Sequence, residues 1–179
     1  LIAVGLTLVY GLLRILHVAH AGLVTLGGYI CVIVTNQTSS FLLAVLTSMI
    51  LVGLAGMIIY RICYQPILDQ PPFVPLIASI GLFIAMEELF RIFFGAYGLS
   101  FTELPLQEPL ALMQINLKQA EWITIASSVG FVAMLAFLAN RTKLGLAWKA
   151  TVTDSEIASS FGVNIIQVRY LNFFIGSSL

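Results

Sequence analysis

The sequence predicts an all-α fold, a polytopic bundle of transmembrane helices. Composition gives two reasons: 60% of the 179 residues are hydrophobic and only 9% are charged, and the mean hydropathy is +1.04. A soluble domain usually carries about 25% charged residues, so this chain has too few charges to cover a surface in water. A third reason is the length of its apolar runs, several of which approach the ~20 residues that cross a bilayer.

These runs predict five helices and part of a sixth in one transmembrane domain that covers residues 1–179. The expected helices are residues 1–16, 18–34, 41–60, 73–95, 122–140 and 168–179. The chain begins and ends inside apolar runs, which indicates a fragment. With a net charge of zero it has little attraction for nucleic acid, and the lipid bilayer is its expected surrounding.

The basic residues are distributed unevenly between the two ends of these helices. Six of the eight fall at one end, namely Arg14, Arg61, Arg141, Lys143, Lys149 and Arg169, and Arg91 and Lys118 fall at the other. Because cytoplasmic loops are enriched in Lys and Arg, we expect the polar loop 141–167 to be cytoplasmic. The loop 96–121 then faces outward, and its Pro105 and Pro109 argue against one uninterrupted helix there.

The segment Gly5–Ile30 is rich in glycine. Small residues allow close packing of helices in lipid, but they also interrupt helices, and interrupted helices line the substrate cavity of some transporters. Both interpretations stay open, and the second makes five residues candidates for a translocation path: His17, His20, Gly22, Gly27 and Gly28. Two histidines without a further Cys, His, Asp or Glu nearby make a poor metal site, so we expect no metal.

Three charged residues lie inside the apolar run 73–95. Arg91 follows Glu87 by four residues and Glu88 by three, and both spacings allow side chains on one helix to meet. Charges within a membrane are usually paired or face a cavity. We therefore favour an intramembrane charge pair, with a role in a substrate or proton path as the alternative.

The polar segment Arg141–Asn164 contains the signature of a short helix. Thr153 and Glu156 have the spacing of a capping box, and Gly162 suits the left-handed residue that ends a helix. Between them lies a small apolar face made of Ile157, Ala158 and Phe161. Lipid headgroups or a groove on a partner protein would both cover that face, and periodicity does not choose between them.

The sequence lacks the motifs that define two classes of intramembrane enzyme. A rhomboid-like protease needs a GxSG nucleophile with a distant His, and an intramembrane metalloprotease needs HExxH; the sequence contains neither string. A passive channel or structural membrane protein stays open, although it would not need a capped cytoplasmic helix.

Three ordered blocks of the sequence resemble one known family. The first block, Gly5–Tyr29, reads GLTLVYGLLRILHVAHAGLVTLGGY. The second joins YQPI at Tyr64–Ile67 to VPLIASIGL from Val74, and the third is Arg141–Asn164. In these blocks, and over essentially its whole length, the chain resembles the inner-membrane permease subunit of branched-chain amino acid ABC transporters.

The chain departs from the family pattern at three of these positions. His17 replaces an Asn of the family, Ala21 a Gly, and Gln65 an Arg. The first two lie in the block where the broken helix would approach the translocation path, so they bear on the choice of substrate. Permeases for urea and short amides are close relatives of this family, so they stay as an alternative.

The resemblance implies the ABC importer type of bundle, with a broken glycine-rich helix and a short cytoplasmic coupling helix. It implies import of branched-chain or other small amino acids, with no chemistry performed by this chain. It also implies the residues of the ATPase-coupling loop: Asp154, Glu156, Ile157, Ala158, Phe161 and Gly162. The expected partners are cytosolic ATP-binding subunits that hold ATP and Mg, a second related permease and an extracytoplasmic substrate-binding protein, all at the inner membrane.

Overall fold

The computed structural model describes residues 1–102, 109–112 and 115–179, and helices make up most of this part of the chain. The α-helices are α1 (Ile2–Leu13), α2 (His20–Thr38), α3 (Phe41–Ile59), α4 (Phe73–Phe94), α5 (Gln119–Arg141), α6 (Lys143–Thr153), α7 (Ser155–Ser160) and α8 (Ile165–Ser178). A π-helical turn, η1 (Tyr60–Tyr64), and a 3₁₀ turn, η2 (Gln65–Ile67), extend α3. Two short strands complete the fold: β1 (Pro109–Leu112) and β2 (Ile115–Lys118).

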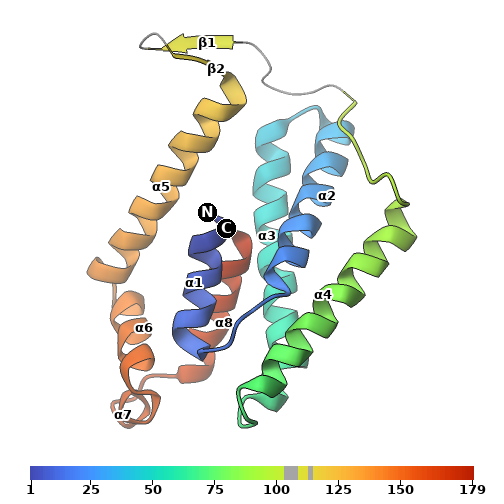
Figure 1. Ribbon diagram of the computed structural model, residues 1–179. Helices are drawn as coiled ribbons and strands as arrows, with labels where there is room; N and C mark the ends of the chain where they lie inside the picture. The colour runs from blue at the N-terminus through green and yellow to red at the C-terminus, as the bar shows by residue number, and fades with distance from the viewer. Residues whose placement is uncertain (103–108, 113–114) are drawn as a thin grey trace.

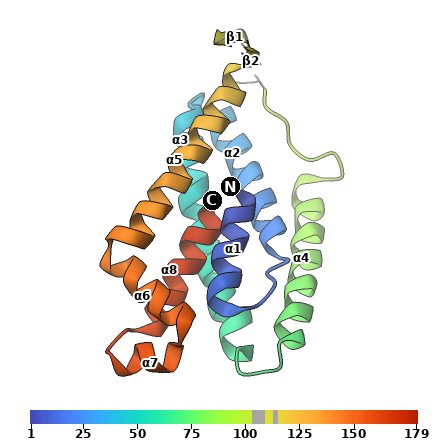
Figure 2. The same cartoon turned by 60° about the vertical axis from the view of Figure 1, so that its left-hand side comes forward.

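The centre of the bundle is α8, the last helix of the chain, which packs against both α1 and α3. Helix α3 also packs against α2, and α2 in turn contacts α4. Both views place α4 and α5 on opposite flanks of this group (Figures 1 and 2). The bundle therefore has a packed middle, made of α1, α2, α3 and α8, and two outlying helices.

Four helical segments in the described part of the chain are long and apolar enough to cross a membrane. They are His20–Thr38, Phe41–Ile67, Phe73–Phe94 and Gln119–Arg141. Helices α1 and α8 are also apolar but shorter. The structure thus confirms the predicted all-α polytopic bundle, and the chain is a multi-pass membrane protein.

The first two helices differ from the prediction at their boundaries. The first ends at Leu13 rather than residue 16, because Arg14 adopts a left-handed conformation with φ of 54° and its N–H bonds to the Tyr10 carbonyl. The next begins only at His20 and runs unbroken through its glycines to Thr38. The interruption expected in the glycine-rich segment therefore lies before the glycines, in the link formed by residues 14–19.

The two polar loops contain more regular structure than the sequence predicts. The expected cytoplasmic loop 141–167 contains α6 as well as α7. The expected outer loop 96–121 contains an antiparallel hairpin in which Pro109 pairs with Lys118 and Leu112 with Ile115. Pro109 is the first residue of its strand, where a missing N–H is tolerated. Pro105 lies outside the described residues.

The elements separate cleanly toward two ends of the bundle. The end of α1, the turn η2, the start of α4, and α7 gather at the lower end of Figure 1, and α6 lies close above them. The end of α2, the end of α4 and the hairpin lie at the upper end. The six basic residues expected on one side belong to elements near the lower end, whereas Arg91 and Lys118 belong to elements at the upper end.

Candidate functional site: the α6–α7 segment and the α1–α2 link

The helix α7 is held at its start by a single carboxylate. Asp154 lies between α6 and α7 in an extended conformation, and its Oδ1 accepts hydrogen bonds from the N–H groups of Glu156 (2.9 Å) and Ile157 (3.0 Å). The N-cap is therefore Asp154, and the predicted cap, Thr153, is wrong by one residue. Thr153 is instead the last residue of α6, and its hydroxyl donates to the Lys149 carbonyl.

The end of α7 has the left-handed glycine that the sequence predicts. Gly162 has a φ of 83°, its N–H bonds to the Ser159 carbonyl, and the N–H of Val163 bonds to the Ala158 carbonyl. A residue with a Cβ would be strained in this conformation. The chain therefore turns sharply at Gly162 and enters α8, whose first N–H groups are capped by Asn164 through a bond from Gln167 N–H to Asn164 Oδ1.

The apolar residues of α7 and its C-cap residue Phe161 point in two directions, which corrects the prediction of one shared face. Ala158 is 3% exposed and faces the bundle, whereas Ile157 is 57% exposed and Phe161 is 84% exposed. Residues four apart lie on one side of a helix, and residues one apart do not. Ile157 and Phe161 thus form an uncovered apolar pair, and Ala158 anchors the helix from behind.

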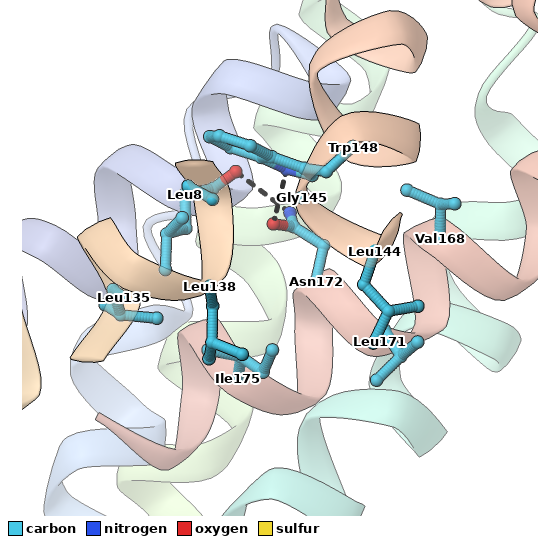
Figure 3. Close-up of a pocket in the computed structure, with 11 residues that line it drawn as sticks. Leu8, Leu135, Leu138, Leu144, Gly145, Trp148, Val168, Leu171, Asn172 and Ile175 are labelled. Atoms are coloured by element: carbon cyan, nitrogen blue, oxygen red, sulfur yellow. Dashed lines mark hydrogen bonds between the residues drawn. The ribbon is translucent and has the colours of Figure 1, made fainter. Parts of the chain in front are cut away.

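Helix α6 connects this segment to the packed middle of the bundle through two polar side chains. Trp148 Nε1 donates to Asn172 Oδ1 of α8 (3.1 Å), and Asn172 Nδ2 donates to the Leu8 carbonyl of α1 (2.9 Å). Figure 3 shows both bonds beside an apolar cavity of about 120 Å³ that α1, α5, α6 and α8 line. A tryptophan in a polar segment and an asparagine in an apolar run were the signals that sequence reasoning missed.

Helices α5 and α6 approach each other closely at the turn between them. An added Cβ at Gly145 would lie within 3.0 Å of the Leu138 carbonyl oxygen and of the Ala139 backbone. Only glycine fits this contact, so the α5–α6 corner is sharp. The close contact fixes the angle at which α6 leaves α5.

The link between α1 and α2 is fixed by buried polar contacts. His17 Nδ1 lies 2.6 Å from the Tyr64 hydroxyl of η1, and Ala19 N–H donates to Ser79 Oγ of α4 (3.0 Å). His17 and His20 are both buried, with ring centroids 6.0 Å apart. They do not share a helix face, because His17 lies in the link and His20 is the first residue of α2.

The three glycines of α2 have different surroundings. An added Cβ at Gly22 would lie 2.9 Å from Met86 Sδ of α4. Gly27 approaches α3, where Ser48 Oγ donates to its carbonyl at 2.9 Å. Gly28 has no other heavy atom within 4 Å of such a Cβ. Two of the three glycines thus serve close helix packing, and the third borders open space.

The charged residues of α4 form one ion pair. Arg91 Nη1 lies 3.4 Å from Glu88 Oε1, and both side chains are more than half exposed. Glu87 makes no ion pair with a described residue. In the part of the chain that the structure describes, no three His, Cys, Asp or Glu side chains are grouped to hold a metal ion.

Comparison with known proteins gives a consistent result. The family model for the permease component of branched-chain amino acid transport systems matches residues 1–179. Relatives named as high-affinity branched-chain amino acid transport system permease proteins include LivH of Salmonella typhimurium (26% identity over 193 residues), LivH of Escherichia coli (25% over 197) and BraD of Pseudomonas aeruginosa (27% over 192). Each match covers 100% of this chain but 62% of the relative. No solved structure shows significant similarity.

Proposed function

We propose that this chain, which belongs to the family of permease components of branched-chain amino acid transport systems, forms part of a membrane permease that imports branched-chain or other small amino acids. The match of the family model to all 179 residues carries the proposal. The chain spans 62% of the length of the curated relatives. The membrane we propose is the inner membrane.

We call residues 154–162 the coupling segment, because we expect this part of the chain to contact the ATP-binding subunits. Ile157 and Phe161 offer an exposed apolar pair on a rigidly capped helix, which is the kind of anchor that a groove on a partner accepts. Asp154 and Gly162 hold the two ends of that helix, Ala158 fixes it to the bundle, and Glu156 lies at its start. ATP and Mg would be bound by the partner, and this chain would perform no chemistry.

The assembly that we propose has two permeases, with the ATP-binding subunits below and an extracytoplasmic binding protein above. The permeases would alternate between inward and outward openings as rigid groups of helices rock against each other. A hinge for such rocking is available in the link between α1 and α2. His17, which lies in this link, is buried beside α8 and η1, and His20, with which α2 begins, is buried near His17.

The residues of the translocation path stay a proposal, and the packing contacts distinguish among them. Gly28, with open space beside it, is the best candidate to line the path. Gly22 and Gly27 would act by allowing α4 and α3 to approach α2. Glu88 and Arg91 are best explained as a self-neutralised pair near one end of α4, since they pair with each other, and Glu87 lies beside them.

ATP-driven uptake by the complete transporter tests this function. We expect proteoliposomes that contain the full-length permease and its partners to accumulate leucine, isoleucine or valine when ATP is supplied to the ATP-binding subunits. Transport of urea or acetamide in place of these amino acids would identify the alternative substrate class. Uptake that does not depend on ATP would instead identify a passive channel.

The coupling assignment has its own test. The substitution Gly162→Val should reduce the stimulation of ATP hydrolysis and uptake, because valine is strained at a positive φ, while the protein still inserts in the membrane. Gly130→Val on α5 is the matched control, since no other heavy atom lies within 4 Å of its added Cβ. Normal uptake and normal ATPase stimulation in Gly162→Val would contradict the assignment.

A further inference from the structure

A second cavity, of about 360 Å³, lies where the end of α1, the junction of α6 and α7, and α8 meet. Its lining is polar and charged, unlike that of the apolar cavity in Figure 3. At about 30 Å³ for each water, its volume corresponds to roughly a dozen water molecules. That space is enough for one small molecule, and it opens at the end of the bundle that carries the coupling segment.

The charges around this cavity are balanced but not paired. Arg14 and Arg169 approach it from α1 and α8, and Asp154 and Glu156 approach it from the coupling segment. These four side chains all belong to the described part of the chain, and no ion pair within 4.0 Å joins any two of them. Two basic and two acidic residues therefore line one cavity without forming ion pairs with each other.

One of these guanidinium groups has an unused donor. Arg169 interacts with the hydroxyl of Tyr60, but its Nε is buried and has no hydrogen-bond partner. A buried donor without a partner is unfavourable, so an acceptor that reached this nitrogen from the cavity would be favoured. On the opposite wall, Asp154 uses only its Oδ1 to cap α7.

This arrangement selects a ligand that carries both charges. A simple anion would meet the carboxylates as well as the guanidinium groups, and a simple cation would meet the reverse. A zwitterion satisfies both walls, because its carboxylate can bond to arginine while its ammonium bonds to the acidic side. The remaining lining includes three aliphatic residues, Leu12, Leu13 and Val152, so an aliphatic part of the ligand would not meet charges on every side.

We propose that this cavity binds a free zwitterionic α-amino acid at the cytosolic end of the permease and that the bound molecule inhibits import. By joining Arg14 and Arg169 to Asp154 and Glu156, the ligand would hold α7 against α1 and α8. That restraint opposes the movement of the coupling segment on which ATP-driven import would depend. The regulatory part of this inference rests on the proposed function, whereas the binding part rests on the charges of the cavity alone.

Inhibition of ATP hydrolysis measures the effect. The intact transporter in nanodiscs is stimulated by its binding protein, already saturated with leucine, and free leucine is then raised further. We expect the stimulated hydrolysis to fall with leucine, but not with leucinamide, 4-methylpentanoate or inorganic phosphate at the same concentrations. The first two compounds each lack one of the charges, and phosphate tests for a general anion site.

Two variants link the inhibition to the cavity. Loss of one charge-assisted hydrogen bond, worth about 1.5–3 kcal/mol, should raise the leucine concentration for half-inhibition by about tenfold or more in Arg169→Gln and in Glu156→Gln. Arg61→Gln is the control, because Arg61 is an exposed basic residue that does not line the cavity. Equilibrium dialysis of labelled leucine, without the binding protein, gives the same comparison for variants whose hydrolysis is low.

The outcomes separate the two proposals. Equal inhibition in the wild type and in Arg169→Gln, or equal inhibition by phosphate and leucine, would overturn the amino acid site. Normal uptake of leucine with no inhibition and no bound leucine would also overturn it, while leaving the proposed function intact. A transporter that never moves amino acids would overturn the proposed function, and dialysis would still decide whether the cavity binds one.

Discussion

Helices α8 and α5 are both apolar, but they occupy opposite situations in the bundle. Helix α8 contacts α1 and α3 along its length, and Phe173 in its middle is completely buried. Helix α5 has no buried residue, although it is long enough to cross a membrane. Apolarity suits both helices to lipid, so it cannot be what separates them.

The difference lies in small residues that meet across the contacts. Gly5 of α1 faces Gly176 of α8, and Gly53 and Gly56 of α3 face the side chains of Phe174 and Ser177. An added Cβ at any of these glycines would lie within 3.0 Å of a neighbouring helix. Gly130 of α5, in contrast, has no such neighbour. In lipid, where helices gain little from apolar burial, close backbone approach decides which helices associate.

The largest expected effect is the loss of the α3–α8 contact. Gly56→Leu would place a side chain where Ser177 and the Phe173 carbonyl already lie, and overpacking of this kind costs about 3 kcal/mol at its upper range. We expect thermal unfolding of the purified full-length protein in detergent at a clearly lower temperature. Gly130→Leu is the matched control and should unfold like the wild type; equal effects would mean that α5 is packed as closely as α8.

A smaller effect is expected from the contact that holds the α1–α2 link. Tyr64→Phe would leave buried His17 Nδ1 without its hydrogen-bond partner, at a cost of about 1–2 kcal/mol. Tyr10 is exposed, so the control variant Tyr10→Phe should have the same free energy of unfolding as the wild type. Unfolding in denaturant measures both, and similar stabilities of the two variants would show that the link does not depend on this bond.

The bond between α6 and α8 should contribute about 1 kcal/mol. Trp148→Phe removes its donor to Asn172 and keeps an aromatic ring in place. Asn172→Leu removes this bond and the bond to Leu8 together, so it should destabilise the protein more. The unfolding midpoints of the two variants give the comparison, and the reverse order would separate α6 from the packed middle of the bundle.

The smallest effect is expected on α4, which lies outside the packed middle. A triple variant tests this, with Gln in place of Glu87, Glu88 and Arg91. Its free energy of unfolding should differ from that of the wild type by less than about 1 kcal/mol, because the ion pair between Glu88 and Arg91 is exposed. Uptake should stay near normal. Complete loss of uptake at normal expression would place these charges in the translocation path instead.

Much of the fold could be predicted because each membrane helix needs an uninterrupted run of apolar residues. The helix predicted from the run Phe41–Tyr60 differs from α3 by one residue at its end. The short helix α7 was predictable for a different reason, since the spacing of Thr153 and Glu156 marks its start and Gly162 marks its end. Its cap was misplaced by one residue because Thr153 and Asp154 are both good N-caps, and only the backbone conformation selects between them.

The contacts of the candidate site could not be predicted in the same way. Nothing in the spacing of His17 indicates Tyr64, which follows 47 residues later, or indicates that Ala158 turns inward while Phe161 turns outward. The charged cavity also brings together Arg14 and Glu156, which are remote in sequence. Such pairings depend on how the helices cross, and hydropathy carries no information about crossing.

The sequence by itself determined that this chain crosses a membrane several times, which ends of its helices carry the basic residues, and where a short capped helix interrupts the apolar pattern. These properties follow from composition and local chemistry, which act over a few residues. Only the tertiary structure decided that α8 occupies the centre and that the non-helical link precedes the glycines of α2. It also decided that two basic and two acidic residues line one cavity. Those features arise from contacts between distant segments, and such contacts exist only once the helices have packed.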